Sequence, residues 1–160
     1  MNEQVRLLQA EMRADLQAIQ ETYAALHSAG RHITEPEMGI VVGYYLHVLY
    51  SLFENLFARI ATTFGNQVTD KAQWHAQLLR RMTLDVKGIR PRVIGGESYK
   101  CLNELRRFRH LFRNAYVLRF DPERLALVLK DARRLERLYE HDLEKFLGFL
   151  DDLADEEASA

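Results

Sequence analysis

The residues best suited to chemistry lie in one basic stretch, residues 105–116. If this stretch is a helix, turning about 100° per residue, its apolar residues gather on one side and Arg106, His110 and Arg113 on the other. Arg109 falls on an edge of the apolar side, where an arginine keeps its stem packed and its guanidinium free. A planar guanidinium suits a phosphodiester, which it can hold with two donors. A basic, solvent-exposed helix face beside a packing stripe would give the same pattern.

The charge distribution also points to an anionic partner. The formal net charge is −1, yet residues 80–119 hold 11 of the 22 Lys and Arg residues. The same segment has only three acids: Asp85, Glu97 and Glu104. A basic segment in a near-neutral protein indicates a local anionic ligand, with nucleic acid among the candidates. Ordinary charged helix surfaces are the alternative explanation.

Most other catalytic signatures are missing from the sequence. It has no Gly-rich phosphate loop, no nucleophile elbow and no His-Glu-x-x-His motif. No two of its histidines are four residues apart: His27, His32, His47, His75, His110 and His141. Its one cysteine, Cys101, excludes an intramolecular disulfide framework and a multi-cysteine metal site. We therefore expect no metal site.

Two polar residues lie in or near the most apolar part of the chain. We expect His47 to be a hydrogen-bonded core histidine. Glu54 follows directly after the apolar stretch that contains His47, residues 38–53. Its carboxylate either lies at the surface of the bundle or pairs with an arginine from another helix, and the sequence leaves both options open.

Helices must position these residues, because the apolar pattern is helical almost throughout. Between Val5 and Leu26, apolar residues recur every three or four positions, and Gly30 ends this first helix. Thr34, before a proline and an acid, predicts the start of a second helix that runs to about Phe64. Apolar residues cover nearly every side of it, so we expect it to be the central helix.

The remaining elements are predicted from their caps and breakers. Asp70 is expected to cap a short third helix that reaches Met82, and residues 83–96 are expected to be an irregular loop. Ser98 is expected to cap a fourth helix over about residues 99–117. Asp121, followed by proline, starts a fifth whose apolar stripe runs through residues 125–153. The fold class is therefore all-α: an antiparallel bundle of about five helices.

The sequence favours a soluble, cytoplasmic protein without a membrane partner. The longest apolar stretch, residues 38–53, has 16 residues and includes His47 and Ser51. It is shorter than a membrane span and suits a buried helix. The first six residues are too charged for a secretory signal.

The basic stretch resembles the signature of HEPN-domain proteins, specifically the HepT-like ribonuclease toxins. That signature has an arginine, a polar residue, a few variable positions, a histidine, one further residue and a tyrosine. Arg109 matches the arginine, His110 the polar residue and Tyr116 the tyrosine. Asn114 stands where the family has its histidine.

The resemblance extends over most of the chain. Leu46-His47, Tyr50 and Glu54 resemble the second helix of the family, and residues 74–82 resemble the third segment of one bacterial subgroup. Residues 121–125 and 146–150 resemble the last helix. This similarity implies a single HEPN-like helical domain over residues 1–155, followed by a short acidic tail over residues 156–160.

The family resemblance implies a metal-independent endoribonuclease without a cofactor. Two subunits form a homodimer, so that both motif helices line a shared cleft for RNA. The arginine, here Arg109, holds the scissile phosphate, and the histidine moves a proton while the RNA 2′-hydroxyl attacks. Arg106 and Arg113 would bind RNA beside it.

The resemblance also implies a protein partner. Many such toxins are paired with an MNT-type nucleotidyltransferase antitoxin. In some pairs the antitoxin silences the toxin by AMPylation of the motif tyrosine, which is Tyr116 in this sequence.

Asn114 leaves open whether the chain is an enzyme. A carboxamide cannot take a proton near neutral pH, and losing a general acid–base group costs roughly 10²–10⁴-fold in rate. The chain is then a natural inactive relative, a disabled variant, or a protein in which His110 has taken over proton transfer. We expect a toxin scaffold that is weak or inactive as a ribonuclease.

Two alternatives remain from the sequence. One is a non-catalytic HEPN binding module that docks a nucleotidyltransferase or RNA. The other is a structural helical dimer whose arginines pair with acids such as Glu54.

Overall fold

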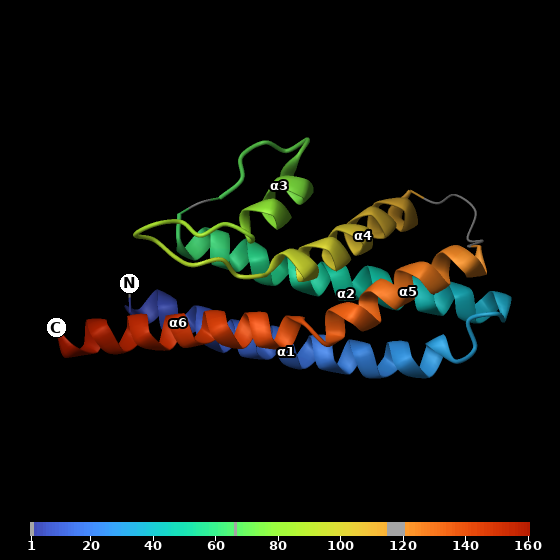
Figure 1. Ribbon diagram of the computed structural model, residues 1–160, viewed down its shortest axis with the longest axis horizontal. Coiled ribbons are helices and arrows are strands. Elements are labelled where there is room, and N and C mark those ends of the chain that lie inside the picture. Colours follow the sequence, from blue (N-terminus) through green and yellow to red (C-terminus); the bar gives the residue numbers. More distant parts are fainter. Residues whose placement is uncertain (1, 66, 115–120) are drawn as a thin grey trace.

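The predicted all-α bundle is confirmed. The computed structural model describes residues 2–65, 67–114 and 121–160. These form six helices: α1 (Asn2–Gly30), α2 (Pro36–Thr63), α3 (Trp74–Arg81), α4 (Gly96–Arg113), α5 (Pro122–Glu136) and α6 (Tyr139–Ser159). In Figure 1, α1 and α6 run along the bottom of the bundle, α2 crosses its middle, and α3 and α4 lie above α2. Outside the helices, the described residues contain one isolated β-bridge, between Val86 and Arg90.

Helix α2 is the central helix, as its composition predicts. It contacts α1, α3, α4 and α5. Its buried apolar residues point to several sides: Val42, Leu46, Leu49, Tyr50, Phe53, Leu56, Phe57 and Ile60. By length and hydropathy α2 could also cross a membrane, but half of its most apolar 18-residue window is buried inside the bundle. The core helix of a bundle has the same composition.

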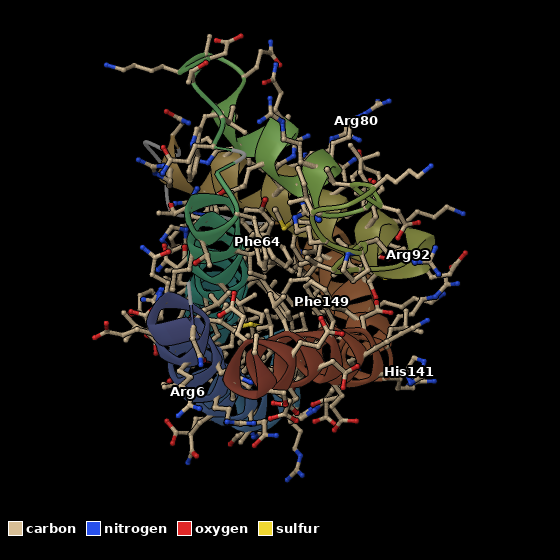
Figure 2. The ribbon with its side chains drawn as sticks, turned by 90° about the vertical axis from the view of Figure 1, so that its left-hand side faces the viewer. Arg6, Phe64, Arg80, Arg92, His141 and Phe149 are labelled. Carbon is tan, nitrogen blue, oxygen red and sulfur yellow. The ribbon has the colours of Figure 1, made fainter. Side chains whose placement is uncertain are left out.

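Aromatic side chains fill the interior between α2 and α6. Viewed along the bundle, Phe64 and Phe149 point inward, whereas Arg6 and Arg80 lie at the periphery (Figure 2). The rings of Phe64 and Phe149 lie 6.1 Å apart. This separation of apolar interior and charged surface is the burial that the periodic apolar pattern predicts.

Only part of the cap predictions is confirmed. Asp121 caps α5, because its side chain accepts a hydrogen bond from the Glu123 amide at 3.0 Å. Thr34 does not cap α2, whose N-cap position is Glu35. Asp70 does not cap α3 either: it accepts from the Ala72 amide, in the turn before the helix begins.

The start of α4 is capped from another helix. The predicted cap, Ser98, lies inside α4, which begins at Gly96. Asp142 of α6 accepts hydrogen bonds from the Ser98 hydroxyl and, at 3.1 Å, from the amide of Gly95. A carboxylate at a helix N-terminus satisfies free N–H groups and interacts well with the helix dipole. The cap prediction was wrong because the capping group comes from a distant part of the chain.

The predicted last helix is two helices, which makes six among the described residues. At the break, the amides of Arg137 and Leu138 bond to carbonyls three residues earlier, Arg134 and Leu135. Such tighter bonds end α5 without a proline or glycine. Helix α5 packs on α2 and α4, whereas α6 packs along α1, so the break lets one stretch of chain serve different neighbours. Helix α6 continues to Ser159, through most of the expected tail.

The loop between α3 and α4 is irregular, as predicted, and is organised around a buried arginine. The side chain of Arg90 donates hydrogen bonds to the carbonyls of Arg81, Leu84 and Pro91 at 3.1–3.3 Å. Arg90 is only 3% exposed. Arg90, one of the basic residues of segment 80–119, therefore stabilises the loop through its hydrogen bonds and does not face an external ligand.

Candidate functional site

A pocket of about 490 Å³ lies where the C-terminal half of α4 faces the start of α3. Five of its lining residues come from the end of α4: Arg106, Arg109, His110, Arg113 and Asn114. The opposite side is formed by residues of and just before α3: Ala72, Gln73, His75 and Ala76. The pocket thus contains every predicted site residue except Tyr116, which lies outside the described residues.

Arg109 is held in place by α2. Its Nε donates to Ser51 Oγ at 2.9 Å, and the Ser51 hydroxyl in turn donates to the His47 carbonyl at 2.9 Å. Its Nη1 lies 3.8 Å from Glu54 Oε1, and its side chain is 16% exposed. The expectation of a free guanidinium was therefore wrong, since α2 runs beside α4 and places two polar groups under it. A guanidinium has further N–H donors, which can still serve a ligand in the pocket.

Glu54 links two basic side chains. Its side chain is 6% exposed, with Oε1 near Arg109 and Oε2 at 2.8 Å from His75 Nδ1. Of the two options that the sequence left open, the structure shows pairing with an arginine from another helix. A buried carboxylate requires such partners, because leaving it unpaired would be strongly destabilising.

Asn114 ends α4. It occupies the C-cap position, and its Nδ2 donates to the His110 carbonyl at 2.8 Å. Helix α4 therefore stops at Arg113, short of the predicted end near residue 117, and residues 115–117 lie outside the described part of the chain. The carboxamide satisfies one of the carbonyls that every helix end leaves without an intrahelical partner.

The other α4 side chains of the pocket are less constrained. Arg106 donates from Nε and Nη2 to Asn103 Oδ1, at 3.1 and 3.0 Å. His110 and Arg113 are exposed. Arg107 turns away from the pocket and pairs with Glu104 at 3.5 Å. Four basic side chains thus gather on one wall.

The pKa of His47, on α2, is affected by its burial and by these positive charges. Burial, followed by the charges of Arg109 and Arg113, lowers the pKa of its imidazole. Its ring stacks on Phe112, with centroids 5.2 Å apart, and its buried Nδ1 has no hydrogen-bond partner among residues 2–65, 67–114 and 121–160. Within the described part of the chain, this nitrogen therefore lacks the hydrogen bond that we expected for a core histidine.

The effect of Glu54 extends to a neighbouring tyrosine. Burial and the carboxylate of Glu54 together raise the pKa of the Tyr50 hydroxyl.

Sequence reasoning did not assign a role to His75. It lies 21 residues from Glu54 in the chain, across a loop, and no fixed spacing relates the two. The only available signals were the carboxylate in an otherwise apolar helix and the place of His75 at the start of a short helix. Within the described residues, no cluster of three or more His, Cys, Asp or Glu side chains could hold a metal ion.

Comparison with known protein families matches residues 41–150 to the family described as HepT-like protein. The chain belongs to the HepT-like family. The match covers more than half of the HepT-like chain, from α2 to α6, and includes the whole pocket. Helix α1 lies before the matched range, although it packs against α2 and α6. Neither the comparison with curated proteins nor the comparison with solved structures found a match.

Proposed function

We propose that this HepT-like chain is the toxin component of a HEPN/MNT toxin–antitoxin pair, and that it is a cytoplasmic, metal-independent endoribonuclease scaffold with weak or no cleavage. The observation that carries the proposal is the common pocket wall of Arg106, Arg109, His110 and Arg113, with Asn114 at its end. Arg109 would bind the scissile phosphate, because Ser51 and Glu54 fix its orientation. Arg106 and Arg113 would bind neighbouring phosphates.

Asn114 accounts for the weak cleavage in this proposal. It occupies the position of the motif histidine but cannot transfer a proton near neutral pH. The Asn114→His variant should therefore cleave single-stranded RNA roughly 10²–10⁴-fold faster than the wild type and should inhibit growth more strongly. Gel assays of a labelled RNA oligonucleotide would measure the rate.

A matched exchange controls for the added histidine. Asn55→His places the same side chain at an exposed position of α2, outside the pocket, and should leave the rate unchanged. If Asn114→His changes neither cleavage nor growth, the ribonuclease assignment is wrong.

The proposal includes two partners. A homodimer would bring two α4 helices to one cleft, so sedimentation at micromolar concentration should give twice the 18.7 kDa mass of the chain. A monomer under these conditions would contradict the shared cleft. The second partner is an MNT-type nucleotidyltransferase that adds AMP to Tyr116.

Modification of Tyr116 can be tested by intact mass. After incubation with the candidate antitoxin and ATP, the mass of the chain should rise by whole AMP units. Tyr116→Phe should abolish this rise, whereas Tyr44→Phe, at a tyrosine that is 53% exposed on α2, should not. A rise that persists in Tyr116→Phe would place the modification elsewhere.

A non-catalytic binding module is the second candidate function. It is favoured by the structural use of Asn114, whose side chain closes the end of α4. In that case the wild type and Asn114→His would bind RNA through Arg109, and neither would cleave it.

A further inference from the structure

His75 lies at the start of α3 with one ring nitrogen anchored on a buried carboxylate. Its Nδ1 lies 2.8 Å from Glu54 Oε2; the Glu54 side chain is 6% exposed, whereas that of His75 is 44% exposed. A carboxylate only accepts hydrogen bonds, so Nδ1 is the donor. With the hydrogen on Nδ1, the other nitrogen, Nε2, is the one that accepts a proton. Glu54 therefore selects the tautomer and fixes the ring.

The same carboxylate connects His75 to the proposed phosphate-binding arginine. Glu54 Oε1 lies 3.8 Å from Arg109 Nη1, while Oε2 engages His75. Both basic side chains line the same pocket, one from α3 and one from α4. An RNA phosphate held by Arg109 would thus lie beside an oriented imidazole of the same chain.

We propose that His75 is a catalytic residue that accepts the proton of the RNA 2′-hydroxyl at Nε2, and that Glu54 is its positioning residue. The inference rests on the proposed ribonuclease function. It adds a proton acceptor on α3, outside the α4 motif, and assigns to it whatever cleavage the wild type retains with asparagine at position 114.

The reaction is an internal transfer of the phosphoryl group. The 2′-oxygen forms a bond to phosphorus and gives its proton to His75 Nε2, while the bond from phosphorus to the 5′-oxygen breaks. The departing 5′-oxygen takes a proton from water, and the resulting hydroxide removes the proton from His75. The products are a 2′,3′-cyclic phosphate and a 5′-hydroxyl, and no oxidant or reductant is needed.

The two other histidines near the site fit this role less well. His110 lines the pocket, but none of the carboxylates in the described part of the chain contacts it. His47 lies outside the pocket lining, stacked on Phe112 with its Nδ1 buried. Of these three histidines, His75 is the one that, within the described residues, combines a fixed ring with access to the pocket.

The test uses the full chain, a labelled single-stranded RNA and the residual cleavage of the wild type. His75→Asn keeps an N–H donor near the position of Nδ1 but lacks the second nitrogen. We expect it to lower cleavage roughly 10²–10⁴-fold while RNA affinity, measured by fluorescence anisotropy, stays the same. His141→Asn is the matched control: His141 is exposed on α6, lies at the periphery in Figure 2, and should leave cleavage unchanged.

Chemical rescue separates proton transfer from a structural role. His75→Ala should lose cleavage to the same extent, and added imidazole should restore it, because free imidazole can occupy the vacated space and accept the proton. Loss of cleavage without rescue, or an equal loss of RNA affinity, would overturn the inference.

The Asn114→His variant distinguishes failure of the inference from failure of the proposed function. If Asn114→His cleaves RNA but the wild type does not, or if the wild type cleaves equally well with His75→Asn, the role of His75 is refuted and the ribonuclease function stands. If Asn114→His does not cleave RNA either, both fail together.

Discussion

At the scale of single residues, Glu54 organises the site. Its carboxylate contacts a basic group at each oxygen, Arg109 on α4 and His75 on α3. A buried ion pair adds little net stability once its desolvation is counted, but removing one partner is costly. The main effect of Glu54 is therefore on geometry. Its carboxylate sets the orientation of the two basic groups that face the pocket.

Arg109 should be sensitive even to a change that preserves its charge. Lysine cannot donate from an Nε position to Ser51 while also presenting two parallel donors to a phosphate. Arg109→Lys should therefore weaken RNA binding about tenfold or more, consistent with about 1.5–3 kcal/mol for a charged hydrogen bond. Anisotropy titrations would measure the affinity.

Arg107→Lys is the control for this exchange. Arg107 is exposed, pairs with Glu104 and does not line the pocket. Its affinity for RNA should match that of the wild type. If both exchanges changed the affinity for RNA equally, RNA would be bound by the overall positive charge of α4 and not by the oriented guanidinium of Arg109.

At the scale of helices, the close approach of α2 and α4 places the pocket. A Cβ atom at Gly43 of α2 would lie 3.3 Å from Phe112 Cε2 and 3.5 Å from Phe108 Cζ. The absence of a side chain at Gly43 thus allows the rings of α4 to pack directly on α2. Phe108 and Phe112 lie on either side of Arg109 in the sequence. Their packing therefore sets how close Arg109 lies to α2.

A larger residue at position 43 should displace the end of α4. Gly43→Leu should lower the free energy of unfolding by about 1–3 kcal/mol, as overpacking does, and should also weaken RNA binding. Urea unfolding and anisotropy would measure the two effects. Gly148→Leu is the matched control on α6, where a Cβ would meet nothing within 4 Å. An unperturbed Gly43→Leu protein would show that α2 and α4 adjust without moving the site.

At the scale of the whole molecule, folding places only some basic residues of segment 80–119 on one side of the pocket. Arg90 of that segment is buried in its loop, and Arg107 and Lys100 pair with acids of their own helix. The arginines that line the pocket are Arg106, Arg109 and Arg113. The near-neutral net charge therefore coexists with a local surface that suits a polyanion.

RNA binding should depend on salt in proportion to the phosphates engaged. Contacts from the three pocket arginines predict that the logarithm of the binding constant falls by roughly 2 per tenfold increase in salt for a single strand. Arg113→Gln should lower this slope by roughly 0.7, because one counterion-releasing contact is lost. Arg124→Gln, on α5 and outside the pocket lining, should leave it unchanged. A slope that none of these exchanges alters would place RNA binding on another surface.

The sequence alone determined the helical class, the end of α1, the bounds of α2, the start of α5, the central place of α2 and the gathering of basic residues on α4. These depend on periods of three to four residues and on local start signals such as Pro36 and Asp121, which act within one turn of the chain. The family likeness also rested on such local spacing, in the segment around Arg109 and in further segments along most of the chain.

Only the tertiary structure decided how the site is assembled. Ser51 and Arg109 are 58 residues apart, Glu54 and His75 are 21 apart, and the capping contact of Asp142 spans 44 residues. The break between α5 and α6 likewise follows from their different neighbours, since neither proline nor glycine marks it. Local periodicity carries no information about which side chains meet across a bundle, because packing between helices selects those contacts.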